Sequence, residues 1–248
     1  MKKIFGIIII LAAVCSLSAP AFATSGSWIG VGGGDDNWAT PANWFPGPAA
    51  PTTGEIATFD GVSLGGTTIG IDAGRTVNTV QFNNAATVAY KIGAGGPGND
   101  TLILNNGGAI TMTINNTANQ IFDANLTLGV GGATQTVTLT NDSVGNTLTV
   151  AGSITGSGGA GVKTLAVTGS DNVLLTTGVI GNGGGGGTVA VTKGGAGALT
   201  LSGSNTRLMI VSGIPGPSSL TEQQMLSSLA HVEISILPRE LLFCDMMA

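Results

Sequence analysis

The stretches TLTVAGS (147–153), TLAVTGS (164–170) and ALTLSGS (198–204) share one pattern, in which two apolar residues, two positions apart, precede a glycine. Their first leucines are Leu148, Leu165 and Leu199, so the second interval is twice the first. A short strand that ends in glycine and recurs at a fixed step is typical of a solenoid, whose units are stable only against their neighbours. The three stretches therefore predict stacked coils with a 17-residue step.

The region from Thr67 to Thr206 alternates short apolar stretches with turns rich in glycine and asparagine. Many stretches bury every second residue, as at Val137 and Leu139, which is the period of a β-strand. We expect an all-β region, with strands at 76–82, 86–92, 101–106, 109–116, 119–128, 135–141, 147–153, 163–169 and 188–194. A motif repeated in one orientation favours parallel coils, and an antiparallel β-sandwich is the structural alternative.

The turns carry further predictions. Asn106-Gly107 and Asn182-Gly183 are dipeptides that readily supply a positive φ. The run Gly183–Gly187 is expected to be a flexible loop that no packed coil requires. Asn-Asn pairs occur at 83–84, 105–106 and 115–116. Their side-chain amides either stack as ladders between coils, or these asparagines are simply exposed turn residues.

The composition argues against two classes of protein, disordered chains and nucleic-acid-binding proteins. Charged residues make up 8% of the chain, against about 25% in an average protein, and the formal net charge is −5. The high, patterned apolar content of 42% argues against disorder. Between Thr24 and Thr206 there are four bases and nine acids, without a basic stripe, so nucleic-acid binding is not expected.

Residues 1–23 have the pattern of a secretory signal peptide: Lys2 and Lys3, an apolar stretch at 4–17, and the small-residue cleavage site Ala21-Phe22-Ala23. The stretch is shorter than the roughly 20 residues of a membrane span, although a membrane anchor is the alternative. We expect no transmembrane segment after signal removal, and an exported protein at the cell surface or outside the cell. Cys15 would leave with the signal, so Cys244 has no disulfide partner in the chain.

Two segments flank the repeats. Residues 24–66 contain all three tryptophans and a cluster of prolines, and are expected to form an N-terminal cap. Residues 207–248 contain few glycines and the only histidine, His231, and are expected not to continue the repeat. This tail is either foreign sequence after a frameshift, which we favour, or a helical cap.

The stretch KGGAGALTLSGSNT (193–206) resembles the autotransporter-associated β-strand repeat, through Gly195, Gly197, Leu199, Leu201, Gly203, Asn205 and Thr206. Trp38, Asn43-Trp44 and Ala57-x-Phe59-Asp60 resemble the N-terminal segment of bacterial surface proteins that carry such repeats. The resemblance implies a right-handed parallel β-helix of the passenger type, exported to the cell surface. The sequence departs from the family at Arg207, where a tyrosine turn is usual, and no C-terminal β-barrel is expected in it. It therefore looks like a truncated passenger-type protein, or one exported by another route.

The tryptophans are the candidate ligand site. Trp38 and Trp44, with Trp28, offer aromatic faces on which a sugar ring can stack. The competing interpretation, which we favour, is that they cover the open end of the first coil, where apolar core and unpaired strand edges would otherwise be exposed.

Three acids are weak candidates for a metal site. Asp100 lies in GGPGNDTLI (95–103), which fits the nonapeptide of calcium-binding β-rolls, but a second copy is missing. Asp35 and Asp36 follow three glycines and either bind a cation or form a solvated turn. In each case we favour the turn, so no metal and no cofactor is expected.

Catalytic groups are sparse. A Ser-His-Asp triad or a zinc site in the repeat region lacks its histidine, whereas two acids from adjacent coils remain possible as a glycosidase pair. The sequence favours a non-enzymatic adhesin, stalk or matrix scaffold, with surface glycans or other surface proteins as partners. The alternative is a β-helix that binds or cleaves polysaccharides.

Overall fold

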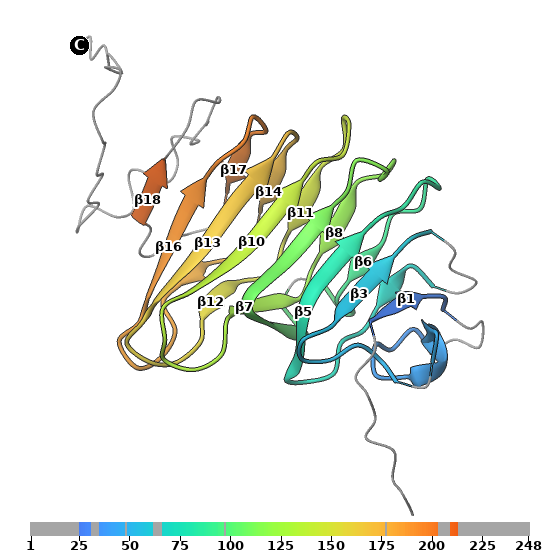
Figure 1. Ribbon diagram of the computed structural model, residues 1–248, viewed down its shortest axis with the longest axis horizontal. Helices are drawn as coiled ribbons and strands as arrows, with labels where there is room; N and C mark the ends of the chain where they lie inside the picture. The colour runs from blue at the N-terminus through green and yellow to red at the C-terminus, as the bar shows by residue number, and fades with distance from the viewer. Residues whose placement is uncertain are drawn as a thin grey trace, which may run out of the picture.

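The computed structural model describes residues 25–30, 35–47, 49–61, 66–96, 98–176 and 178–202, and the backbone of residues 209–212. In these ranges the chain forms eighteen β-strands and one short 3-10 helix, η1 (Pro41–Asn43). Successive coils lie one on another along the long axis (Figure 1). The predicted parallel β-helix is confirmed, and the β-sandwich alternative is wrong. No helix in the described part of the chain is long and apolar enough to cross a membrane.

Each full coil contributes to three faces. The long face consists of β3 (Ile56–Phe59), β5 (Arg75–Phe82), the second half of β7 (Thr101–Met112), β10 (Gln135–Asn141), β13 (Val162–Gly169), β16 (Thr188–Lys193) and β18 (Met209–Ser212). The short face consists of β4 (Thr68–Ile69), β6 (Lys91–Ile92), β8 (Gln120–Phe122), β11 (Leu148–Val150), β14 (Val173–Leu175) and β17 (Leu199–Leu201). The third face consists of the first residues of β5 and the first half of β7, with β9 (Asn125–Leu128), β12 (Ile154–Gly156) and β15 (Ile180–Gly181). Arg75, Thr76 and Val77 of β5 are paired there with Leu102, Ile103 and Leu104, and only the rest of β5 lies on the long face.

The register of the short face gives the length of each coil. Its inward residues are paired in the order Ile69, Ile92, Phe122, Val150, Leu175 and Leu201. The shortest of these coils runs from Ile69 to Ile92, and the longest runs from Ile92 to Phe122. Every coil on this face is therefore longer than the interval between Leu148 and Leu165.

The predicted 17-residue step is accordingly wrong. Leu148 and Leu199 both belong to the short face, two coils apart, and each is paired with Val173 between them. Leu165 belongs to the long face, where it is paired with Val137 and Val191. The shared pattern marks strands on two different faces, because every face buries alternate residues in the same way.

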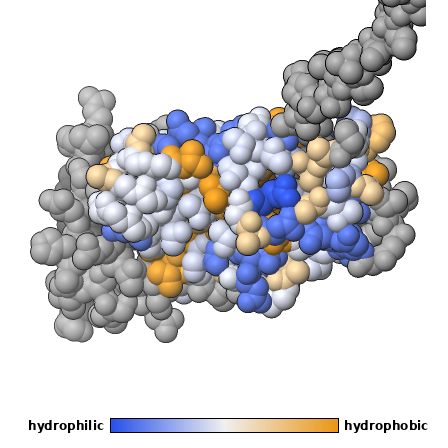
Figure 2. Space-filling view, turned by 90° about the horizontal axis from the view of Figure 1, so that it is seen from below, coloured by the Kyte–Doolittle hydropathy of each residue, from blue (hydrophilic) through white to orange (hydrophobic). Residues whose placement is uncertain are grey.

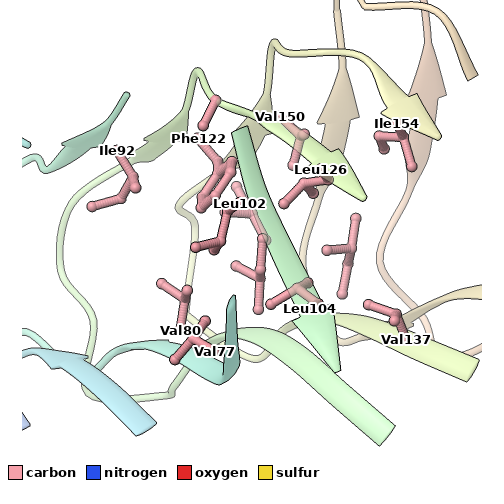
Figure 3. Close-up of a cluster of buried hydrophobic side chains, with 14 of the residues drawn as sticks. Val77, Val80, Ile92, Leu102, Leu104, Phe122, Leu126, Val137, Val150 and Ile154 are labelled. Atoms are coloured by element: carbon pink, nitrogen blue, oxygen red, sulfur yellow. The ribbon is translucent and has the colours of Figure 1, made fainter. Parts of the chain in front are cut away.

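The core runs along the inside of the coils. Figure 3 shows side chains from all three faces pointing toward one another, among them Ile92, Phe122 and Val150 from the short face. Leu102, Leu126 and Ile154 form a second in-register column on the third face. These side chains are fully or almost fully buried, so neighbouring coils bury apolar surface that one coil alone would expose.

Glycines allow the coils to touch at the corners. A Cβ atom on Gly159 would lie 2.3 Å from the Cα of Gly132, and one on Gly183 would lie 1.9 Å from the carbonyl oxygen of Gly156. The run at 183–187 is thus packed on the preceding coil, and the expectation of a loop that no coil requires is wrong. Gly107 has the predicted positive φ of 74°, whereas Gly183 does not have one.

Amide side chains connect coils at the corner between the long and short faces. The Asn115 amide donates to Oδ1 of Asn83, 3.0 Å away, which is a direct ladder between coils. Gln120 is buried and donates to Oδ1 of Asn116 and to the Val88 carbonyl of the preceding coil. The amide-ladder prediction is confirmed at 83 and 115. Asn106 is exposed and contributes no such ladder within the described part of the chain.

The N-terminal segment is an atypical first coil. Its strand β1 (Gly26–Trp28) is parallel to β3, and β2 (Trp44–Phe45) is antiparallel to β1 at the edge of the sheet. On the short face, the backbone at Asn37 is paired with Gly70 beside β4. The segment therefore covers the first strand of the long face and the first strand of the short face. Strand β3 lies within residues 24–66 but already belongs to the stack of coils.

At the other end, β18 is paired in parallel with β16, Ile210 lying beside Val191. The sheet thus extends to Ser212, beyond the expected end of the repeats at residue 206. The signal peptide, His231, Cys244 and the alternatives for residues 213–248 lie outside the described residues.

Candidate binding sites

The three tryptophans form one buried aromatic cluster. Trp28 and Trp38 are fully buried and Trp44 is 2% exposed. The ring centroids of Trp38 and Trp44 lie 4.9 Å apart at an interplanar angle of 56°, and both rings pack on Phe59 of the first full coil. Their packing is that of a plug over the core.

Each indole N–H of the cluster has a backbone acceptor. Trp38 donates to the Pro51 carbonyl (3.1 Å), Trp44 to the Trp38 carbonyl (2.7 Å) and Trp28 to the Gly66 carbonyl (3.4 Å). Since no ring face is left open to solvent, Trp38 and Trp44 cannot stack on a sugar in this conformation. Their burial removes the observation on which the ligand-binding interpretation depended, and their positions are those that the cap interpretation expects.

Asp35 and Asp36 brace the turn that carries Trp38. Asp35 accepts hydrogen bonds from the Asn37 amide (3.0 Å) and from the Thr40 hydroxyl (2.6 Å). Asp36 accepts from the Gly66 amide (2.9 Å), and a Cβ at residue 66 would lie 1.8 Å from Oδ2 of Asp36. The two carboxylates thus hold a turn in place, as the turn interpretation expects.

Asp100 joins two coils. One of its carboxylate oxygens, Oδ2, accepts from the backbone amides of Ile71 (3.0 Å) and Ala94 (2.7 Å). Ile71 belongs to the preceding coil and Ala94 to the glycine-rich loop before β7. The nonapeptide is therefore a turn that uses its aspartate on backbone donors. No group of three or more metal-binding side chains occurs in the described ranges.

The four bases of the repeat region all have close partners. Arg75 is paired with Asp72 (2.6 Å) and Lys91 with Asp123 (2.7 Å). Lys193 donates to the carbonyls of Gly194 (2.6 Å) and Gly195 (2.9 Å), and burial lowers the pKa of its ammonium group.

Lys163 is a polar core residue that was not among the residues predicted to be important from the sequence. It is 1% exposed, and its ammonium group donates to the carbonyls of Gly131 (2.9 Å) and Ala133. Gly156 leaves room for its stem, since a Cβ there would lie 3.0 Å from Cγ of Lys163. The signal was present in the sequence, because Lys163 is in phase with the inward residues Leu165 and Val167.

The surface is mixed. In Figure 2, hydrophobic residues form separate patches between hydrophilic ones. The large apolar side chains that are exposed include Ile114 and Val144 at turns between the long and short faces, and Phe45 at the cap.

Comparison with known proteins identified no homologue. No protein-family model matches the chain, and neither a curated protein nor a solved structure does.

Proposed function

We propose that the chain is a non-enzymatic scaffold exported to the cell surface, where its β-helix acts as a stalk or matrix element. One observation carries the proposal: the candidate metal-binding aspartates and the buried Lys163 are engaged in hydrogen bonds of the fold itself, within the cap or between coils. Asp35, Asp36 and Asp100 bind backbone amides or a hydroxyl of the fold, and Lys163 binds loop carbonyls.

The elongated architecture supports the same role. A solenoid lengthens by adding coils, and each coil contacts only its neighbours. Such a fold can therefore hold the two ends of the chain far apart without needing a larger core. The polysaccharide-binding alternative has lost the exposed tryptophans on which it mainly rested. Surface glycans and other surface proteins remain our proposed partners, and the resemblance to autotransporter-associated repeats supports the surface location.

The experiment is expression of the full chain in a bacterial host, followed by cell fractionation and N-terminal sequencing. We expect a product that begins at Thr24 and is degraded by protease added to intact cells. A chain that keeps Met1 and stays in the cytoplasm would contradict export.

The absence of catalysis is tested separately. The purified product is incubated with a panel of acidic and neutral polysaccharides, and the release of unsaturated or reducing ends is measured. We expect no release above that of heat-denatured protein. Reproducible release would show that the polysaccharide-cleaving alternative is right.

A further inference from the structure

The outward side chains of the long face form a regular two-dimensional array. Strands β10, β13 and β16 are paired without a register shift, so each outward side chain lies directly beside its counterpart on the next coil. From β3 to β16 the columns of the array read Thr136, Thr164 and Ala190; Ile56, Thr79, Ala109, Thr138, Ala166 and Thr192; and Thr58, Gln81, Thr111, Thr140 and Thr168. A shorter column at the edge of the face pairs Val162 with Thr188.

The array is uncharged and built mainly from small side chains. Threonine and alanine occupy these outward positions except Ile56 and Gln81 in the first two coils and Val162 on β13, and Ala190 is only 4% exposed. The strands that carry it lie side by side with a common slant across the front of the molecule in Figure 1. The face therefore presents hydroxyl and methyl groups on an even, close-packed surface.

The spacing of the array is set by the backbone. Neighbouring strands lie about 4.8 Å apart, and alternate residues along a strand lie about 6.7 Å apart. The hydroxyl groups of Thr140 and Thr168 are hydrogen-bonded to each other at 2.9 Å. Because threonine is also stiff at χ1, the array is ordered before any ligand binds, which lowers the entropic cost of binding.

We propose that this face binds ice. A threonine hydroxyl both donates and accepts hydrogen bonds, as a water molecule does, and a periodic, uncharged array is complementary to a surface that is itself periodic and uncharged. A protein partner would be expected to use aromatic or arginine anchors, and a sugar surface to use aromatic stacking. The outward columns contain neither type of residue. The inference does not depend on where the cell places the protein.

The test is inhibition of ice recrystallisation by the full chain, measured as the growth rate of ice grains in a frozen sucrose film. We expect severalfold slower growth than with serum albumin at the same concentration. Growth at the albumin rate would overturn the proposal.

Matched variants locate the effect. Thr138→Lys places a charged stem in the middle of the array and should abolish most of the inhibition. Thr149→Lys introduces the same change at an outward, similarly half-buried position on the short face and should leave the inhibition intact. Urea unfolding of both variants checks that they are folded. Equal loss in the two folded variants would count against the long face.

Two other partners for the long face, a polysaccharide surface and a second copy of the chain, are tested in the same way. The wild-type chain is also mixed with microcrystalline cellulose and, separately, run on a sizing column. Retention on cellulose, or a dimer that Thr138→Lys dissociates, in the absence of ice inhibition would replace ice with that occupant.

Discussion

At the scale of single residues, the aspartate that most resembles a calcium ligand, Asp100, connects two coils. An aspartate in a glycine-rich turn is the same sequence signal whether its carboxylate binds a cation or backbone N–H groups. Only the position of the neighbouring coil decides between them, and Asp100 faces the amides of Ile71 and Ala94. The sequence thus identified the turn and its polar residue, while the partner came from a segment 29 residues away.

Asp100→Ala tests this role. The substitution leaves two backbone amides without their acceptor, and we expect it to lower the free energy of unfolding by about 2 kcal/mol or more. Asp100→Asn keeps one side-chain oxygen as an acceptor and should lose less. The measurement is urea unfolding followed by circular dichroism, with and without excess Ca²⁺. A marked rise in stability of the wild-type chain on adding Ca²⁺ would instead indicate a cation site.

Gly183 and Gly184 provide a matched pair. Gly183→Ala places a methyl group against the Gly156 carbonyl, so overpacking should destabilise the fold by about 1–3 kcal/mol. A Cβ at Gly184 meets no atom within 4 Å, and Gly184→Ala should be neutral or slightly stabilising. Urea midpoints of the two variants are compared. Equal midpoints would mean that the run at 183–187 is a loose loop after all.

At the scale of elements, the alternation of apolar residues predicted the strands but could not assign them to faces. QTVTLTN and TLTVAGS both bury every second residue, yet the first lies on the long face and the second contains a short-face strand. Coil length varies because the segments between strands differ in length: residues 93–100 join β6 to β7 in the longest coil, whereas residues 70–74 join β4 to β5 in the shortest. A repeat whose turns vary has no fixed period to find, and the apparent 17-residue step joined two faces of one coil.

Strand β8 contains a direct test of the inward and outward assignment. Phe122 is fully buried between Ile92 and Val150, and Phe122→Ala should cost about 3–5 kcal/mol. Its neighbour Ile121 points outward and is 37% exposed, so Ile121→Ala should change the stability by about 0.5 kcal/mol or less. Thermal and urea unfolding give both values. Similar losses in the two variants would show that this strand does not bury one face.

At the scale of the whole molecule, the stack has a first coil unlike the others. The sequence indicated an aromatic segment, but composition alone could not decide whether the rings face solvent or the core. The rings face the core because Phe59, the inward residue of β3, gives them an apolar surface on which to pack. Trp28, Trp38 and Trp44 all contact it. A solenoid without such a plug would expose the apolar end of its core, so the ring cluster is a condition for a stable stack.

The most direct test of the stacked coils is a disulfide between two outward residues of the short face, with Cys15 and Cys244 replaced by serine. Thr149 and Leu174 are register partners on β11 and β14, whereas Ala166, which a 17-residue coil would place beside Thr149, lies on the long face. We predict that Thr149→Cys with Leu174→Cys forms an intramolecular disulfide on mild oxidation, and that Thr149→Cys with Ala166→Cys does not. Crosslinking of the second pair, and not of the first, would contradict the arrangement of coils described above.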